Sequence, residues 1–197
     1  MRVEPFAILS KHYDPSGKLF GLLVTHSLLV ARKARQLARA YNKRHPDKTV
    51  DMEFLTEASL LHDIGIQECD APAIFCTGTA PYICHGVLGR QILEAEGLPR
   101  HALVCERHTG AGITRADVES QKLPLPDRSF LPVSIEEKLI CVADKFYSKI
   151  PERLWKEKKL RKIEKTLSRF GPEAPARWMA LCRECLPDSD AEADELS

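Results

Sequence analysis

The spacing of apolar residues restricts this chain of 197 residues to a helical fold. From Leu19 to Arg44, apolar side chains recur every three or four residues, while most arginines and lysines fall on other faces. This spacing is typical of an amphipathic helix, which has about 3.6 residues per turn. No run of alternating apolar and polar residues predicts a strand. We therefore expect an all-α protein.

Further helices are expected from the same spacing and from signals at helix ends. Asp51 is a plausible N-cap, prolines open two segments, and Ser134 with Glu137 forms a capping box. The expected helices span 51–65, 81–97, 99–108 and 135–150. Residues 151–187 are expected to form a C-terminal helical extension packed on the first 150, with a basic amphipathic helix and a helix around Trp178. A disordered acidic tail is expected at 188–197.

Six polar side chains are expected on the core-facing sides or at the ends of these helices: His26, His62, Asp63, His85, His108 and Asp144. Singly, a histidine on an apolar face is commonly a satisfied core residue, and a buried aspartate is commonly a helix cap. Burying unpaired carboxylates is costly, so two of them among several imidazoles call for a cation. Imidazole and carboxylate suit Zn, Mn, Fe, Co or Ni, and one carboxylate can bridge two ions. Asp63 is the natural bridge.

These residues also carry a family resemblance. The ordered series, with the motif HDIG intact at 62–65, resembles the HD-domain superfamily of metal-dependent phosphohydrolases over roughly residues 17–150. The stretches "ERHTGAGIT" at 106–114 and "EEKLICVADK" at 136–145 resemble a group of small, stand-alone HDIG proteins. The resemblance implies a bundle of helices with a metal site between them. Residues 1–150 would then form an HD metal-binding domain.

The resemblance further divides the ligands into two sets. By likeness to the family, His26, His62, Asp63 and Asp144 hold a first metal, and His85 and His108 hold a second that is bridged through Asp63. The expected cofactor is a divalent transition metal in two ions, with Fe, Mn, Zn, Co or Ni favoured over Mg. One position departs from some relatives, which carry an acid or a lysine where this chain has Ile66.

The expected reaction is hydrolysis of a phosphate ester or anhydride by a metal-bridged hydroxide, because no side-chain nucleophile stands out. Asp63, His85 and His108 are the expected catalytic residues. The candidates for binding substrate phosphate are Arg107, Thr109 and Lys145, which lie beside the ligands in sequence. Neighbours on a helix point about 100° apart, so solvent-facing charge is the simpler interpretation for the arginine and the lysine.

Composition limits the partners and the compartment. The formal net charge is +1, from 29 basic and 28 acidic residues, so no overall field favours nucleic acid or a membrane surface. A small phosphorylated substrate, a nucleotide above all, is expected, and a homodimer is left open. No apolar run approaches membrane-spanning length, and the N-terminus lacks a signal-peptide pattern. Seven scattered cysteines fit a reducing cytoplasm.

Two other functions stay open at this point. A similar ligand set occurs in di-iron oxygenases of the superfamily, such as inositol oxygenase, and a regulatory module could bind a nucleotide without turning it over. The segment from Arg153 to Arg169 carries eight basic residues. A solvated helix face is the favoured interpretation of that segment, ahead of a nucleic-acid or nucleotide patch.

Overall fold

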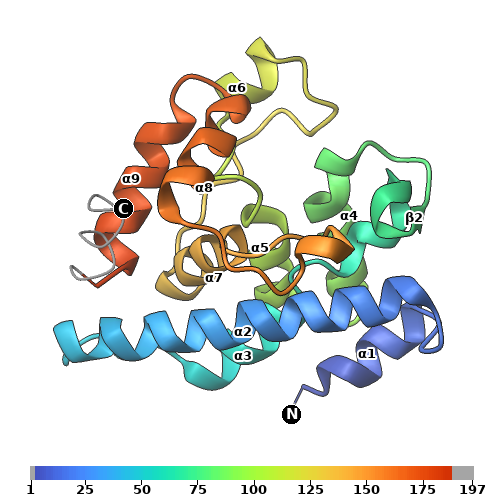
Figure 1. Ribbon diagram of the computed structural model, residues 1–197, viewed down its shortest axis with the longest axis horizontal. Helices are drawn as coiled ribbons and strands as arrows, with labels where there is room; N and C mark the ends of the chain where they lie inside the picture. Colours follow the sequence, from blue (N-terminus) through green and yellow to red (C-terminus); the bar gives the residue numbers. More distant parts are fainter. Residues whose placement is uncertain (1–2, 188–197) are drawn as a thin grey trace.

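The computed structural model describes residues 3–187 and is mostly helical (Figure 1), which confirms the all-α prediction. The α-helices are α1 (Pro5–His12), α2 (Lys18–Arg44), α3 (Met52–Leu61), α4 (His85–Ala95), α5 (Pro99–Arg107), α6 (Arg115–Ser120), α7 (Ile135–Lys145), α8 (Leu160–Leu167) and α9 (Ala174–Cys185). Short 3-10 helices are η1 (Ile64–Glu68), η2 (Pro72–Ile74), η3 (Tyr82–Cys84), η4 (Pro151–Arg153) and η5 (Ser168–Phe170). The predicted acidic tail lies outside the described residues.

One small hairpin interrupts the helices. Strand β1 (Asp70–Ala71) pairs antiparallel with β2 (Cys76–Thr77). Each strand has two residues, which is too short to produce the alternating pattern by which a strand is predicted from sequence.

Helix α2 runs along one side of the molecule, and α3 and α7 pack against it (Figure 1). Its buried stripe includes Leu22, Leu23, His26, Val30 and Leu37, as the spacing predicted. His26 lies between Leu23 and Val30, which belong to two different hydrophobic clusters. A polar side chain therefore sits where the two halves of the core meet.

The end of α3 differs from the prediction. Asp51 caps the helix by accepting from the amide of Phe54, as expected, but α3 ends at Leu61 rather than at Gly65. The chain turns into η1 instead. A Cβ at Gly65 would lie 2.2 Å from the carbonyl oxygen of His85 and 2.4 Å from the amide nitrogen of Gly89. The glycine is needed because α4 packs directly on this turn.

Three other helix boundaries also shift. The segment predicted to begin near Pro81 first forms η3, so α4 begins at His85, and α7 ends at Lys145. The basic segment is helical only in α8, and residues 154–159 have no regular helix. There the ammonium of Lys158 donates to the carbonyls of Lys145 and Tyr147, which holds this segment against the end of α7.

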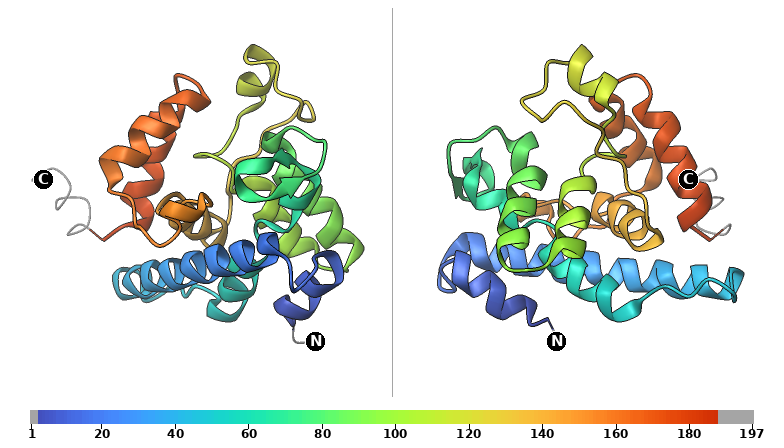
Figure 2. Two further views of the ribbon diagram at one scale, coloured as in Figure 1. Left: turned by 45° about the vertical axis from the view of Figure 1, so that its right-hand side comes forward. Right: turned by 180° about the vertical axis from the view of Figure 1, so that it is seen from behind.

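The C-terminal helices share a core with the rest of the molecule. One cluster includes Leu37 of α2, Ile140 of α7, Ile163 of α8 and Trp178 of α9. Both α8 and α9 lie over the α7 side of the molecule, as two further views show (Figure 2). Among residues 3–187, no helix is both long and apolar enough to cross a membrane.

Candidate metal centre

The first cluster of possible ligands joins α2, the end of α3 and α7. Nε2 of His26 lies 2.9 Å from Oδ1 of Asp144 and 3.3 Å from Oδ2 of Asp63. Nε2 of His62 lies 2.9 Å from the same oxygen of Asp63. All four side chains are buried, and their candidate ligand atoms lie within 4.8 Å of one another. This spacing suits one ion with imidazole and carboxylate ligands.

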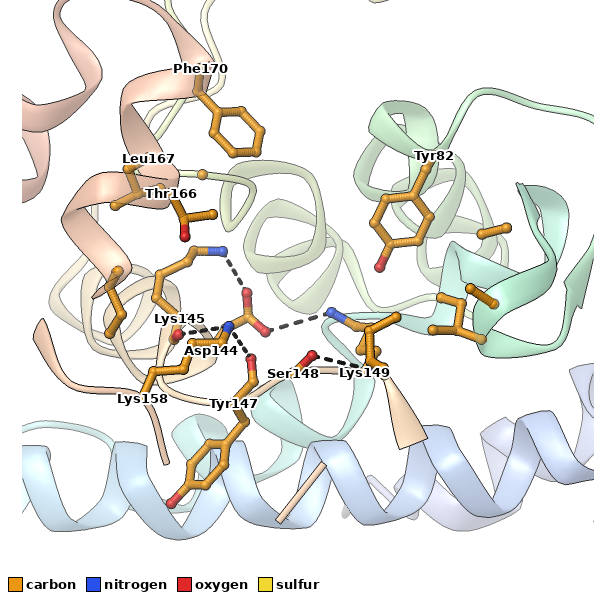
Figure 3. Close-up of a pocket in the computed structure, with 16 residues that line it drawn as sticks. Tyr82, Asp144, Lys145, Tyr147, Ser148, Lys149, Lys158, Thr166, Leu167 and Phe170 are labelled. Carbon is orange, nitrogen blue, oxygen red and sulfur yellow. Dashed lines mark hydrogen bonds and ion pairs between the residues drawn. The ribbon is translucent and has the colours of Figure 1, made fainter. Parts of the chain in front are cut away.

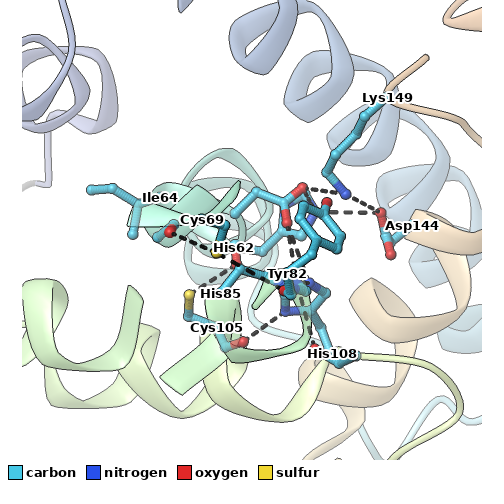
Figure 4. Close-up of polar contacts among 12 residues, drawn as sticks. His62, Ile64, Cys69, Tyr82, His85, Cys105, His108, Asp144 and Lys149 are labelled. Atoms are coloured by element: carbon cyan, nitrogen blue, oxygen red, sulfur yellow. Dashed lines mark hydrogen bonds and ion pairs between the residues drawn. The ribbon is translucent and has the colours of Figure 1, made fainter. Parts of the chain in front are cut away.

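The second cluster uses the other oxygen of Asp63. Oδ1 of Asp63 lies 3.6 Å from Nε2 of His85 and 3.4 Å from Nε2 of His108. The two imidazole nitrogens are 3.1 Å apart (Figure 4). His85 opens α4 and His108 follows the last residue of α5. Asp63 therefore faces both clusters, one oxygen toward each.

Backbone carbonyls orient three of the histidines. Nδ1 of His62 donates to the carbonyl of Ser59 at 2.7 Å, and Nδ1 of His85 donates to that of Tyr82 at 2.6 Å. Nδ1 of His108 donates to the carbonyl of Cys105 at 2.7 Å. Each acceptor comes three residues earlier in the chain, so local helical geometry sets the ring. Because Nδ1 carries the donated proton, Nε2 is the nitrogen available to a metal.

The buried polar atoms at the centre fit a cation. Nε2 of His62 and both carboxylate oxygens of Asp63 are buried and, among the described residues, make close ion-pair contacts but no hydrogen bond of good geometry. Burial and the nearby His108 lower the pKa of His85 to about 3, so its ring is neutral. The Nε2 lone pairs of His85 and His108 then face each other, an arrangement that a positive ion between them would make favourable.

Without a metal, the first cluster is held by opposite charges. Burial alone would raise the pKa of Asp63, but His62 and Lys149 lower it to well below its usual value. Burial also opposes protonation of His62, yet Asp63 and Asp144 raise its pKa to about 9. A metal ion that binds here must therefore displace a proton from His62.

Lys149 is a central residue that the sequence analysis missed. Its Nζ lies 2.7 Å from Oδ2 of Asp63 and 3.6 Å from Oδ1 of Asp144, and only 13% of its side chain is exposed. The residue lies beyond the end of α7, where no helical spacing relates it to the ligands. Tyr82 was also missed, and its ring stacks on His85 with centroids 4.8 Å apart. Its position three residues before His85 is a signal that could have identified it.

The three predicted substrate contacts take different positions. Thr109 is buried, with Oγ1 3.5 Å from Nε2 of His85. Lys145 pairs with Asp144. The guanidinium of Arg107 lies 3.1 Å from a carboxylate oxygen of Glu137 and joins α5 to α7. The structure thus brings the threonine and the lysine to the centre, while a carboxylate already engages the arginine.

A cavity of about 380 Å³ opens beside Asp144 (Figure 3). Lys145, Lys149 and Lys158 contribute to its polar part. Its other lining residues include Ile74, Tyr82, Ile163, Leu167 and Phe170. The cavity therefore combines cationic side chains next to the ligands with apolar and aromatic walls.

Comparison with known proteins places the chain in a family. The family model described as HD domain matches residues 23–148, which include all six candidate ligands. The chain belongs to the HD domain family. An uncharacterized protein of Methanocaldococcus jannaschii is 34% identical over 151 residues, which cover 76% of this chain and 80% of that protein.

Two further relatives are much longer than their matching parts. Both are named tRNA (cytidine(56)-2'-O)-methyltransferase. The protein of Picrophilus torridus is 36% identical over 99 residues, which cover 50% of this chain and 25% of the methyltransferase. The protein of Thermoplasma volcanium is 32% identical over 118 residues, which cover 59% of this chain and 30% of the methyltransferase. No solved structure matches this chain.

Proposed function

We propose that this protein is a metal-dependent phosphohydrolase that cleaves a phosphate ester or anhydride of a small molecule, with a nucleotide as the favoured substrate. The observation that carries the proposal is Asp63, which offers one oxygen to each of two buried groups of ligands. Two divalent ions held there would supply an activated water and neutralise charge on a phosphate. The imidazole and carboxylate donors favour Mn, Fe, Co, Ni or Zn over Mg.

The cavity beside the ligands suits a phosphorylated substrate. The ammonium groups of Lys145 and Lys149 would bind phosphate oxygens, and the hydroxyl of Thr109 would donate a hydrogen bond beside His85. Tyr82 and Phe170 offer aromatic faces in the same lining, which suits a nucleobase. The proposal therefore assigns phosphate binding to the lysines and the threonine and base binding to the aromatic part of the wall.

Assays of phosphate release test this function. The purified chain, loaded in turn with each of the favoured metals, should release phosphate from members of a panel of nucleotides and phosphate esters under anaerobic conditions. Asp63→Asn should abolish the release, because both groups of ligands lose their shared carboxylate. Asp127→Asn is the matched control, since this carboxylate is exposed and pairs only with Arg115 among the described residues.

Other outcomes would assign the alternatives. Substrate consumption that requires dioxygen would identify an oxygenase with the same ligands. Nucleotide binding without turnover in any metal would identify a regulatory module. Either result would overturn the proposal.

RNA is a second candidate substrate class. Segments similar to this chain form part of two proteins that are named as tRNA methyltransferases. A phosphate at an RNA end presents the same charge and oxygen atoms as a nucleotide phosphate. Either substrate occurs in the cytoplasm, the compartment expected from the sequence. All seven cysteines of the chain are free thiols, which fits a reducing compartment.

A further inference from the structure

A second, larger groove adjoins the metal cavity. Its volume is about 1090 Å³, and it shares Ser148, Lys158 and Thr166 with the cavity lining. The remaining lining is strongly basic and comes from the segment that contains η4 and α8. Its basic members include Arg153, Lys156, Lys159, Lys162 and Lys165. A continuous series of basic side chains therefore leads from the surface to the metal cavity, where phosphate is proposed to bind.

Basic residues outnumber acidic ones in this segment. Residues 152–166 carry seven lysines and arginines against three glutamates. Glu157 is already engaged, since its carboxylate lies 2.7 Å from Nζ of Lys33 and accepts from the hydroxyl of Tyr147. Among residues 3–187, no carboxylate forms an ion pair with any of the five basic side chains named above. Although the whole chain is nearly neutral, this surface would attract a polyanion.

An exposed tryptophan lies within the same segment. Trp155 is 74% exposed, whereas Trp178 is 1% exposed and belongs to the core. Its neighbours Arg153 and Lys156 both line the groove. Proteins that bind single-stranded nucleic acid combine a basic groove with aromatic side chains on which bases stack. Trp155 is not itself one of the lining residues, but it stands between two of them in the sequence. Lysines alone would suit any polyanion, whereas an exposed indole next to these basic residues favours a polyanion that carries bases.

We propose that this groove binds single-stranded RNA, with phosphates along the lysines and a base stacked on Trp155. RNA binding along the groove does not require hydrolysis. We further infer that one end of the RNA strand enters the metal cavity. This second step rests on the proposed function, because only a hydrolase would act on a phosphate there.

Fluorescence anisotropy with a labelled single-stranded RNA of about twelve nucleotides tests this binding. The full chain carrying Asp63→Asn should bind the RNA without degrading it. In that background, Trp155→Ala should weaken binding by about tenfold, because the variant loses the stacking of one base on the indole. The combined variant Lys159→Glu, Lys162→Glu and Lys165→Glu should weaken binding further. The slope of the logarithm of its binding constant against the logarithm of the salt concentration should also become shallower by about 0.7 for each lost phosphate contact.

Matched variants separate the groove from general effects. Phe6→Ala removes an exposed aromatic ring from α1, and Arg39→Glu with Lys43→Glu and Lys48→Glu reverses three exposed charges outside the groove lining. These controls should bind RNA like the parent chain. Trp155→Ala and the lysine variant, made in the chain with Asp63 intact, should still hydrolyse a small phosphate ester at the unmodified rate, which also shows that they fold.

The outcomes distinguish this inference from the proposed function. Equal binding by the groove variants and the parent would overturn the RNA groove, as would equal loss in the controls. Tighter binding of single-stranded DNA or of anionic vesicles would overturn it as well. Hydrolysis of small phosphates without RNA binding overturns only this inference. RNA binding without hydrolysis of any phosphate overturns only the proposed function.

Discussion

At the scale of single residues, the carboxylate of Asp63 is shared by the two clusters of ligands, whereas each histidine belongs to one cluster. Its Oδ2 faces His26 and His62, and its Oδ1 faces His85 and His108. Loss of a ligand that belongs to only one cluster should therefore leave the other ion in place. Loss of Asp63 itself should affect both.

The two histidines of the second cluster give the sharper test. His85→Ala and His108→Ala should each lose about one metal equivalent and keep the other, because the first cluster remains complete. The turnover number should fall on the order of 10² to 10⁴, the loss typical of removing a main electrostatic element from a site. Elemental analysis and steady-state kinetics would measure both. A variant that keeps two ions, or turns over normally with one, would argue for a mononuclear site.

The position of Lys149 predicts that the stability of the protein depends on metal binding. Its ammonium lies between two buried carboxylates, so Lys149→Met should lower the unfolding free energy of the metal-free protein by about 3–5 kcal/mol. A bound cation would replace the lost charge, so added metal should raise Tm more in the variant than in the parent. Lys138→Met, which removes a lysine paired with Glu184 outside the site, is the control. Equal metal-induced shifts in all three proteins would contradict the role of Lys149.

At the scale of secondary-structure elements, the contact between η1 and α4 positions the second cluster. Gly65 allows that contact, so Gly65→Ala should displace α4, and with it His85, and cost about 1–3 kcal/mol through overpacking. Gly21→Ala is the matched control, because Gly21 lies near the N-terminus of α2 and a Cβ there meets nothing within 4 Å. The control should gain about 0.5–1 kcal/mol. Denaturant unfolding and metal content measure both effects. If Gly65→Ala behaves like Gly21→Ala in both measurements, the proposed role of Gly65 is wrong.

At the scale of the whole molecule, the C-terminal helices and the ligand-bearing helices form one hydrophobic cluster. Trp178→Ala should therefore lower global stability by about 3–5 kcal/mol. The metal content of the folded fraction should stay unchanged, since no candidate ligand lies in α9. Thermal unfolding and elemental analysis would check this. A separate low-temperature transition would show instead that residues 151–187 unfold independently of the ligand-bearing helices.

Much of the fold follows from local sequence signals. The length of α2 and the N-caps at Asp51 and Ser134 depend on side-chain periodicity and on hydrogen bonds between near neighbours. The six candidate ligands could be named for a related reason, because a polar side chain on an apolar face is visible in the sequence and is costly without a partner. These features need no knowledge of how the helices pack.

Only the tertiary structure decided how these elements meet. The end of α3 at Leu61 and the need for Gly65 arise from close packing of α4, which no local signal reports. Lys149, which lies beyond the end of α7, contacts Asp63 at the end of α3, and Lys158 joins the basic segment to the end of α7. Sequence determined which side chains must be buried or satisfied. Packing determined their partners, because contacts between distant residues depend on the combined geometry of all the helices.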